Sequence, residues 1–390
     1  MLDNLLASQL EELDKLGLRR QLAYIEGSQG PVTVVDGQEV ILLSSNNYLG
    51  LANHPSLKQA AKKALDQFGS GSGASRLISG SMTLHRQLEK KVADLKGTEA
   101  ALLFPSGYQA NLGILSSLVG RDDTIFSDAL NHASIIDGCR LSHAAVKVYR
   151  HNDMGHLREL LSTTSKNGKW LIVTDAVFSM DGDLAPLEKI VSLAKKYQAS
   201  IMVDEAHSTG VFGPNGSGLV SELRLQEEIE VQMGTFSKAL GSFGAYLAGS
   251  QNLVEWILNR ARSFIYTTAP PPQIAATSIA ALDILRKEPE RKILLWENAA
   301  FLAQGLMDLG YTLGASKSPI IPIIIGDPVR TVQLSISLFK KGVFAYAVRP
   351  PTVPENTSRL RLVAISSHTK SQLEYTLKAF QNAGRELGIL

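Results

Sequence analysis

The sequence predicts an α/β fold, in which a mostly parallel central sheet is flanked by helices and is followed by a smaller α+β C-terminal domain. Two observations support this prediction. From about residue 99, short apolar runs alternate with helical stretches, and after about residue 285 the alternation gives way to a mixed pattern. The chain has 390 residues, of which 44% are hydrophobic and 19% charged. This composition is typical of an ordinary globular protein with more than one domain.

The first 50 residues are predicted to form an N-terminal helix and a connecting segment. Residues 4–16 have the apolar spacing of a helix, and a second helical pattern covers residues 55–67. Pro55 suits the first turn of that second helix, because the N–H that proline lacks would have no helical partner there. We therefore assign residues 1–50 to an N-terminal segment.

Residues 51–285 are predicted to form the large domain with the parallel sheet. Short apolar runs predict its strands: EAALLF, TIFS, AVKVY, KWLIVTD, SIMVDE, EVQMGTF and AYLAG. Helical patterns such as LAPLEKIVSLAKKYQ separate several of these runs. Strand–helix alternation indicates parallel strands whose two faces are covered by helices. Such sheets carry their functional residues just beyond the carboxyl ends of the strands.

Residues 286–390 are predicted to form the small α+β C-terminal domain. A helix is expected near residues 289–309, strands at PIIPIII, VFAYAV and RLRLVAI, and a last helix from Thr369. This mixture of isolated strands and helices differs from the regular alternation before it, so we expect a separate domain.

Charge and cysteine content exclude several classes of protein. The formal net charge is +2 and the basic residues are scattered, which argues against nucleic acid as a partner. The only cysteine, Cys139, excludes an internal disulfide and a cysteine-built metal site. The N-terminus lacks the pattern of a signal peptide, and no run reaches about 18 apolar residues, so no membrane span is expected. We expect a cytoplasmic protein.

Two strand ends carry the residues that point to chemistry. The run SIMVDEAHSTG ends in Asp204, Glu205 and His207, and TFSKALG places Lys238 just beyond a later strand. The first group could bind a metal or cap the next turn, but no further cluster with metal-ligand spacing accompanies it, and no metal is expected. A lysine that forms a Schiff base and an aspartate that holds a pyridinium nitrogen are what pyridoxal 5'-phosphate requires.

Other polar residues fit the same cofactor, although each has an ordinary structural alternative. In LLFPSGYQANLGIL, Gly107 opens a helix after a strand, and free N–H groups there bind an anion such as a phosphate. The same stretch could be a plain loop. His132 follows a short strand and could stack on a planar ring or be an ordinary surface histidine. Thr267 and Thr268 precede a triple proline that would present their hydroxyls, or belong to a simple turn.

Six motifs carry a resemblance to a known family. SGYQAN, NHAS, VFSMDG, VDEAHSTG, TFSKALG and YTTAPPP occur in this order. Together they resemble the α-oxoamine synthases, a branch of the fold-type I pyridoxal-phosphate enzymes, and the likeness runs from SSNNYLGL to RLRLVAISSHT. The resemblance implies a homodimer with active sites at the subunit interface. It also implies an acyltransferase that joins an amino acid to an acyl thioester, carried by coenzyme A or a carrier protein, and releases carbon dioxide and the thiol.

The resemblance also implies roles for individual residues. Lys238 would hold the cofactor covalently and then act as the base, and its surroundings are expected to be apolar enough to favour the neutral amine. Asp204 would face the pyridine nitrogen, His207 the ring hydroxyl, and His132 would stack on the ring. The remaining implied cofactor contacts are Gly107, Tyr108, Ser179 and Thr235, with Thr267 and Thr268 from the other subunit.

The substrate side depends on RPPTVP followed by RLRL. This stretch resembles the family members that condense L-alanine with a pimeloyl thioester to 8-amino-7-oxononanoate in biotin biosynthesis. Arg361 would bind the carboxylate of the amino acid, for which a planar guanidinium is suited. Further implied substrate contacts are Asn46, His132, Thr352 and Arg20. Arg19 could take the place of Arg20, and Arg349 could lie near the substrate or be an ordinary surface charge.

Three alternatives are open on the sequence, one within the family and two outside it. Asp175 in TDAVFSMDG also suits the members that condense glycine with acetyl-CoA, so this position does not separate the two reactions. A dinucleotide-binding dehydrogenase lacks support, because no GxGxxG follows a first strand. A catalytically silent regulator that binds the cofactor is disfavoured by the intact set of Asp204, His207 and Lys238.

Overall fold

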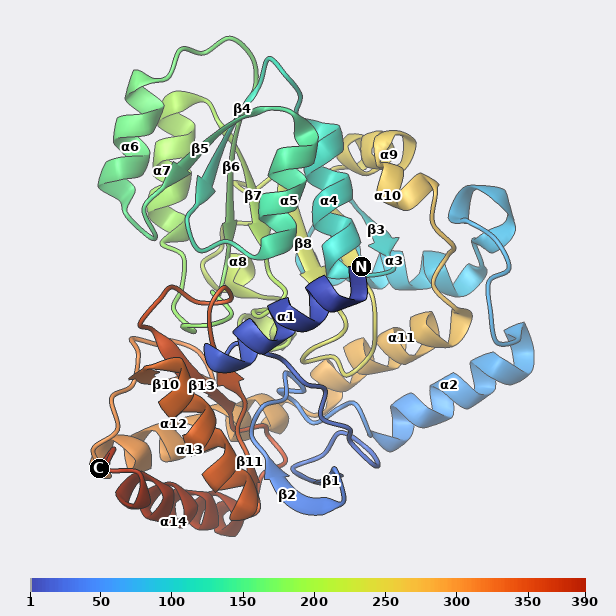
Figure 1. The fold of residues 1–390 in the computed structure, drawn as a ribbon. Coiled ribbons are helices and arrows are strands. Elements are labelled where there is room, and N and C mark those ends of the chain that lie inside the picture. The colour runs from blue at the N-terminus through green and yellow to red at the C-terminus, as the bar shows by residue number, and fades with distance from the viewer. Residues whose placement is uncertain (1) are drawn as a thin grey trace. The chain divides into compact units, whose positions relative to one another are not determined.

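The computed structural model describes residues 2–390, and the chain divides into two compact units (Figure 1). The sheet unit comprises His54–Ser179 and Leu184–Pro289. The terminal unit comprises the residues up to Asn53, Met180–Asp183 and Glu290–Leu390. The N-terminal segment and the C-terminal region therefore belong to one unit, although they stand at opposite ends of the sequence.

The sheet unit contains seven strands and the helices that connect them. The strands are β3 (Ala100–Phe104), β4 (Thr124–Asp128), β5 (Ala145–Tyr149), β6 (Trp170–Asp175), β7 (Ser200–Asp204), β8 (Val231–Thr235) and β9 (Ala245–Gly249). The helices are α2 (Pro55–Phe68), α3 (Thr83–Lys96), α4 (Gly107–Leu118), α5 (Ala133–Ser142), α6 (Met154–Thr163), α7 (Leu187–Tyr197), α8 (Leu219–Glu222), α9 (Gln251–Arg260), α10 (Arg262–Ile265) and α11 (Pro272–Lys287), with a π-helical turn η1 (Arg76–Gly80) and a 3-10 turn η2 (Pro214–Gly216).

The seven strands form one mostly parallel sheet in the order β3-β9-β8-β7-β6-β4-β5. The neighbours from β8 to β5 pair in parallel, whereas β9 runs antiparallel to both β8 and β3. The predicted α/β class with a mostly parallel central sheet is therefore confirmed. The carboxyl ends of β4, β6, β7 and β8 meet at one edge, where polar residues follow each strand.

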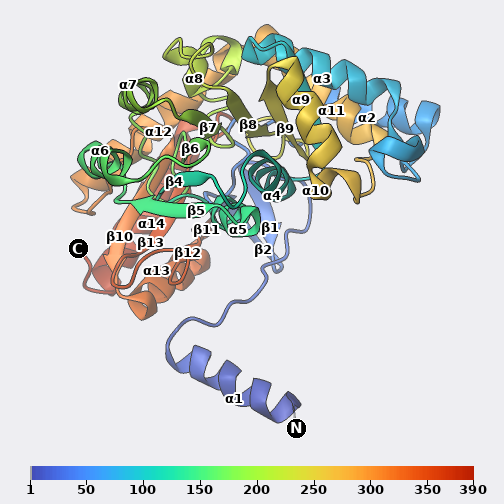
Figure 2. The ribbon, with the colours of Figure 1, turned by 90° about the horizontal axis from the view of Figure 1, so that it is seen from above.

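Helices cover both faces of this sheet. In Figure 2, α4 and α5 lie on one side of the strands and α7 and α8 on the other. The core between α4, α5 and the sheet contains Phe104, Ile114, Ile135 and Met233, each at most 2% exposed. Because the middle strands are buried on both faces, their sequences are continuous apolar runs rather than alternating ones.

The terminal unit contains two three-stranded sheets, in the orders β1-β2-β11 and β10-β13-β12. Its strands are β1 (Val32–Val35), β2 (Gln38–Leu42), β10 (Ile320–Gly326), β11 (Val343–Phe344), β12 (Ala347–Val348) and β13 (Ser358–Val363). Its helices are α1 (Leu2–Lys15), α12 (Glu290–Asp308), α13 (Pro328–Lys340) and α14 (Lys370–Glu386).

The run VFAYAV, expected as one strand, is divided between these two sheets. Its first part, β11, pairs in parallel with β2, and its second part, β12, pairs antiparallel with β13. The chain thus changes partner strands near Ala345, so a single continuous ladder does not form. In β13 the alternation of RLRL places Leu360 and Leu362 in the core of this unit, which leaves Arg359 and Arg361 for the opposite side of the strand.

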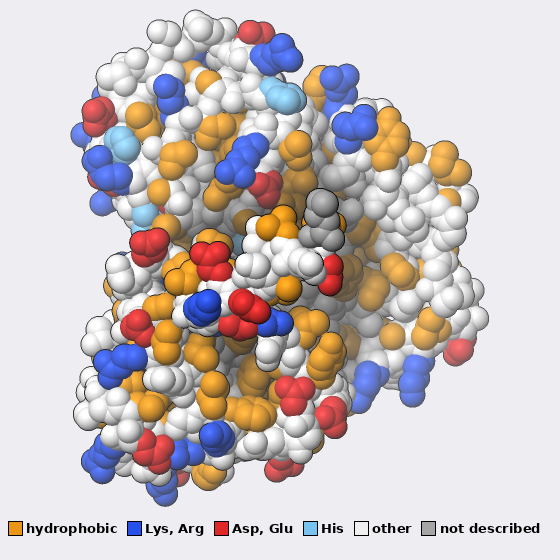
Figure 3. Space-filling model, viewed as in Figure 1, with side chains coloured by type: hydrophobic (Ala, Val, Ile, Leu, Met, Phe, Trp, Pro, Cys, Tyr) orange, Lys and Arg blue, Asp and Glu red, His pale blue; other side chains and the backbone are white. Residues whose placement is uncertain are grey.

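Helix α1 has no buried residue, and its leucines are exposed along its length. Figure 3 shows apolar and charged side chains together on the surface at the place that α1 occupies in Figure 1. Among residues 2–390, no helix is long and apolar enough to cross a membrane.

Candidate active site

The sheet unit brings several of the predicted residues to one edge of its sheet. Asp175 ends β6, Asp204 ends β7 and Thr235 ends β8. In the parallel ladder Asp175 lies directly opposite Asp204. Because the carboxyl ends of these strands are neighbours, their terminal side chains and the loops after them share one site.

Asp204 is a buried carboxylate with a donor at each oxygen. Its Oδ2 accepts a hydrogen bond from Asn111 Nδ2 at 2.8 Å, and its Oδ1 accepts one from the main-chain N–H of Ala206 at 2.9 Å. The residue is 4% exposed. Such an arrangement fixes the orientation of the carboxylate and suits it to hold a cationic ring nitrogen.

Lys238 lies in the loop between β8 and β9. The loop is closed by hydrogen bonds from Phe236 N to Gly244 O at 2.9 Å and from Gly241 N to Lys238 O at 3.0 Å. The lysine is half-buried, and it interacts electrostatically with Asp175 and with His132. Its surroundings are therefore more polar than we expected from the aliphatic residues around it in the sequence.

Asp175 is a site residue that sequence reasoning noted only as ambiguous between two reactions. It is 5% exposed, and its Oδ2 accepts the main-chain N–H of His132 at 2.7 Å. Burial and the nearby Asp204 raise its pKa well above the usual range of an aspartate, although the His132 N–H and the Lys238 charge act in the other direction. Two carboxylates this close cannot both ionise easily, and of the two it is Asp175 whose pKa is raised.

His132 stands at the N-terminus of α5, where its Nδ1 accepts from the main-chain N–H of Ser134 at 3.3 Å. The residue as a whole is exposed to solvent. Desolvation lowers the pKa of its imidazole; the nearby Asp204 raises it and the nearby Lys238 lowers it. A neutral ring with an open face suits stacking on a flat aromatic ligand.

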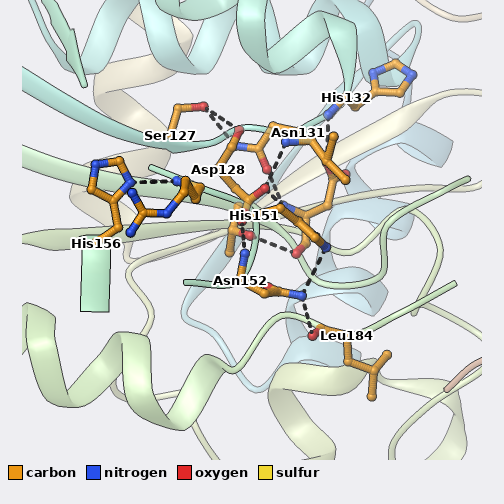
Figure 4. Close-up of polar contacts among 12 residues, drawn as sticks. Ser127, Asp128, Asn131, His132, His151, Asn152, His156 and Leu184 are labelled. Carbon is orange, nitrogen blue, oxygen red and sulfur yellow. Dashed lines mark hydrogen bonds and ion pairs between the residues drawn. The ribbon is translucent and has the colours of Figure 1, made fainter. Parts of the chain in front are cut away.

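A network of side chains holds the loop that leads to His132 (Figure 4). Asp128 accepts from the main-chain N–H of Leu130 and of Asn152, each at 2.9 Å, and lies 2.9 Å from His151 Nδ1. Asn131 donates to Val173 O and accepts from the main-chain N–H of the strand-end aspartate on β6. The loop is thus tied to the ends of β4 and β6.

The N-terminus of α4 has the features of an anion site. Ser106 caps the helix by accepting from Gln109 N at 3.2 Å. A Cβ on Gly107 would lie 2.9 Å from Thr235 Cγ2 and 3.2 Å from Met233 Cε, so only glycine fits there without displacement. Thr235 Oγ1 is buried and has no hydrogen-bond partner within the described chain. A bound phosphate would satisfy this hydroxyl and the free N–H groups of the helix.

The other predicted cofactor contacts lie in the same unit. Tyr108 is half-exposed and its hydroxyl donates to Asp137. Thr267 Oγ1 accepts from Gln109 Nε2 at 3.4 Å. The predicted residues not yet described are Thr268, which forms a β-bridge with Ser75, the buried His207 in the turn after β7, and the half-buried Ser179.

The terminal unit carries the residues predicted to bind the amino acid. Arg361 on β13 is 8% exposed, and its Nη2 donates to the hydroxyl of Tyr48 at 3.3 Å. Burial raises the pKa of that tyrosine, and the neighbouring guanidinium lowers it. Asn46 Oδ1 is buried without a hydrogen-bond partner among residues 2–390. A buried guanidinium and an unsatisfied amide oxygen suit an amino acid, which offers a carboxylate and an amine.

The three arginines that the sequence left open make different contacts. Arg20 is exposed and its Nη2 donates to Thr352 Oγ1 at 3.2 Å, which brings two predicted substrate contacts together. Arg19 instead forms an ion pair with Asp14 at 2.5 Å. Arg349 donates to the carbonyl oxygen of Gly17, so it ties the N-terminal segment to the loop before Thr352.

Glu205, considered as a metal ligand from the sequence, is part of a buried ion pair instead. Its Oε2 pairs with Lys96 Nζ, and both side chains are 0% exposed. Its Oε1 accepts from Ser208 Oγ at 2.8 Å and from Val220 N at 3.0 Å. Within residues 2–390, no group of three or more His, Cys, Asp or Glu side chains is arranged to hold a metal ion.

Sequence reasoning missed Asn111 and Lys96. Asn111 lies within the motif SGYQAN, five residues after the helix cap, and it projects to Asp204. The available signal was a polar residue on an otherwise apolar stretch of α4, which indicates a buried polar contact rather than a solvated one.

The sequence of the chain is similar to those of known enzymes. A family model described as aminotransferase class I and II matches residues 38–380. An 8-amino-7-oxononanoate synthase from Geobacter sulfurreducens is 49% identical over 388 residues, which is 99% of each chain. Another, from Thermoanaerobacter pseudethanolicus, is 48% identical over 98% of this chain and 97% of its own.

Solved structures show the same architecture. A serine palmitoyltransferase from S. paucimobilis with bound PLP-myriocin aldimine superimposes with a TM-score of 0.94 at 35% identity, over 99% of this chain and 98% of the other. An 8-amino-7-oxononanoate synthase from Francisella tularensis has a TM-score of 0.77 at 29% identity, over 89% of this chain and 98% of its own.

Proposed function

Because the chain belongs to the class I and II aminotransferase family, and within it to the α-oxoamine synthases of fold type I, we propose that it is an 8-amino-7-oxononanoate synthase. The reaction is the decarboxylative condensation of L-alanine with a pimeloyl thioester, in biotin biosynthesis. The observation that carries the proposal is its identity, over the whole chain, to several relatives with this name. The cofactor is pyridoxal 5'-phosphate.

The residues present fit this cofactor. The unpartnered Thr235 hydroxyl and the open N-terminus of α4 at Gly107 suit its phosphate. The anchored carboxylate of Asp204 suits its ring nitrogen. Lys238 lies on the loop after the neighbouring strand, where its amine would hold the aldehyde carbon. The cofactor supplies an electron sink for the charge left when a bond at the substrate Cα breaks.

Each residue then has a defined task. Lys238 Nζ takes the proton from Cα of the amino acid once the amine is released, and returns a proton after carbon dioxide has left. Asp204 would keep the ring nitrogen protonated, and His207 would donate to the ring hydroxyl. His132 would lie against the ring face. Asp175 orients His132 by accepting its main-chain N–H, and its raised pKa disfavours a second negative charge beside Asp204.

The substrate contacts are proposed in the terminal unit. The Arg361 guanidinium binds the carboxylate of alanine, and Asn46 Oδ1 offers an acceptor. Arg20 and Thr352 contact the acyl donor, whose distal carboxylate requires a cation or a hydrogen-bond donor.

The assembly and the acyl carrier belong to the same proposal. We propose a homodimer in which Thr267 and Thr268 of one subunit contact the phosphate bound by the other. Both pimeloyl-CoA and a pimeloyl carrier protein suit the chemistry. A cytoplasmic location stays a prediction, supported by a single cysteine that is buried and unpaired.

A matched set of substrate pairs tests the reaction. The enzyme is given alanine or glycine with pimeloyl-CoA or acetyl-CoA, and serine with palmitoyl-CoA, while thiol release is followed and products are identified by mass. Alanine with pimeloyl-CoA should give the highest kcat/KM, and glycine should be slower by roughly 10- to 200-fold because one methyl group separates them. A clear preference for glycine with acetyl-CoA would replace our assignment by a glycine C-acetyltransferase, and one for serine with palmitoyl-CoA by the activity of the structural neighbours.

A further inference from the structure

A continuous hydrogen-bonded path joins Asp204 to His132. Asn111 Nδ2 donates to Asp204 Oδ2 at 2.8 Å and to Ser134 Oγ at 2.9 Å. Ser134 Oγ in turn lies 2.7 Å from His132 Nδ1. Asn111 and Ser134 are each 1% exposed. These two residues, from α4 and α5, form what we call the amide–hydroxyl bridge.

The chemistry of the groups fixes the direction of each hydrogen bond. An ionised carboxylate only accepts, so the amide of Asn111 must present its NH2 group to Asp204. The second hydrogen of that NH2 goes to Ser134 Oγ. The single hydroxyl hydrogen of Ser134 is then directed at His132 Nδ1, which also faces the main-chain N–H of Ser134 at 3.3 Å. Two donors at Nδ1 leave the hydrogen of the neutral imidazole on Nε2.

The charged and titratable groups around His132 come from three other elements. Asp204 ends β7, Lys238 follows β8, and Asp175 ends β6 and holds the main-chain N–H of His132. At Nδ1 the described contacts are the hydroxyl of Ser134, which belongs to the bridge, and the main-chain N–H of Ser134, which belongs to the cap of α5.

We propose that Asn111 and Ser134 are positioning residues that couple the orientation and tautomer of His132 to the carboxylate of Asp204. This inference rests on the proposed function, in which His132 lies against the cofactor ring and Asp204 holds its nitrogen. The bridge links two contacts to the same cofactor ring. Asp204, which would hold the ring nitrogen, is connected through Asn111 and Ser134 to the imidazole of His132, which would cover the ring face. Neither residue touches the reacting atoms.

The first test is nuclear magnetic resonance of the holoenzyme labelled with ¹⁵N-histidine. The spectrum of His132→Gln assigns the His132 signals. In the wild type we expect Nδ1 to show the shift of a nitrogen that accepts strong hydrogen bonds and Nε2 that of a protonated nitrogen. In Ser134→Ala the Nδ1 shift should move toward that of an unbonded nitrogen, and the His132 pKa should rise because a donor facing Nδ1 is lost. Asn111→Leu should change the Nδ1 shift and the His132 pKa in the same direction, by a smaller amount.

Ser142→Ala is the matched control. It removes a buried hydroxyl from the same helix, but Ser142 bonds only to Cys139 O and Ala144 N near the helix end. Its His132 signals should equal those of the wild type. If Ser134→Ala and Asn111→Leu also leave these signals unchanged, the bridge does not orient the ring and the inference is wrong. Two variants are used so that a folding failure in one leaves the other informative.

Steady-state kinetics provide the second readout. Loss of one hydrogen bond to a neutral acceptor, about 1 kcal/mol, corresponds to about a fivefold lower kcat, and the KM for each substrate should stay unchanged because neither residue binds substrate. A kcat equal to that of Ser142→Ala, despite shifted His132 signals, would overturn the coupling to catalysis. The magnetic resonance result requires no substrate, so a wrong choice of substrates in the proposed function would leave it intact.

Discussion

The buried ion pair between Lys96 and Glu205 makes a sharp prediction about stability. Replacement of Lys96 by methionine keeps the length of the side chain but leaves the Glu205 carboxylate buried without its cation. Both side chains are 0% exposed, and Lys96 also donates to the carbonyl oxygen of Ser217. Burial alone would lower the pKa of Lys96, but the carboxylate and the hydroxyl of Tyr246 outweigh it and the pKa is raised. The lysine is thus charged at neutral pH.

The expected cost follows from the complete burial of the pair. Removing one partner of a buried ion pair typically costs about 3–5 kcal/mol, because the remaining charge cannot be solvated. We therefore expect Lys96→Met to lower the free energy of unfolding by about that amount. The double variant Lys96→Met/Glu205→Gln should be more stable than Lys96→Met alone, since its amide is neutral and Oε1 still accepts from Ser208 and Val220.

Urea unfolding followed by circular dichroism measures these differences at pH 7.5. The control is Lys195→Met, which breaks the ion pair to Glu228 on the surface, where the side chains are 62% and 35% exposed. That variant should lose at most about 1 kcal/mol. If Lys96→Met costs no more than Lys195→Met, or if the double variant is the less stable of the two, the pair is not a buried charge pair in solution and the reasoning fails.

Three further predictions concern the cofactor site and the pH dependence of folding. Lys238→Ala should lose all turnover while keeping its circular dichroism spectrum, and borohydride should fix cofactor mass to the wild-type chain only; residual condensation near the wild-type rate would remove the lysine from its role. Gly107→Ala should weaken binding of pyridoxal phosphate to the apoenzyme about tenfold or more, because the new Cβ would lie 2.9 Å from Thr235 Cγ2. The control Gly120→Ala, whose Cβ would have no atom within 4 Å, should bind the cofactor as the wild type does. Burial lowers the pKa of His368 to about 4, so on acidification the unfolded chain binds a proton at this histidine before the folded chain does. The stability that His368 contributes above about pH 6.5 is therefore lost as the pH falls toward 4. His368→Gln should lose less free energy of unfolding between pH 7 and pH 4.5 than the wild type, and an equal loss would contradict the assignment.

The central sheet was predictable because its strands are continuous apolar runs. Each lies between helical patterns, so periodicity and length together separate the two. The hairpin of β1 and β2 was missed, although Asp36 and Gly37 adopt φ of 46° and 78° in its turn. An Asp-Gly pair between apolar runs is the usual signal for such a turn. The division of VFAYAV between two sheets depends on partner strands far away in the sequence, which local patterns do not reveal.

The candidate site was predictable where chemistry and strand ends coincide. Asp204, Lys238 and Gly107 are residue types that the cofactor needs, and each follows or ends a strand at the edge of the sheet where ligands bind. Asn111 and Lys96 were not predictable in this way, because each acts through a neighbour that only the folded chain supplies. Lys96 precedes Gly97 at the end of α3, where a lysine ordinarily serves the helix end on the surface. Its burial is a consequence of tertiary packing alone.

The mounting of Lys238 has a consequence for repeated turnover. The loop that carries it joins two adjacent antiparallel strands, and main-chain hydrogen bonds close its base and the turn after Lys238. In the proposed reaction the amine of Lys238 would be released from the cofactor while its backbone stays fixed, so that only the four-carbon side chain would move. The amine would then stay within one side-chain length of the carbon it had held, at a local concentration far above that of any free amine in solution. Rotation of the side chain alone would then be enough for Lys238 to bind the cofactor again after each cycle.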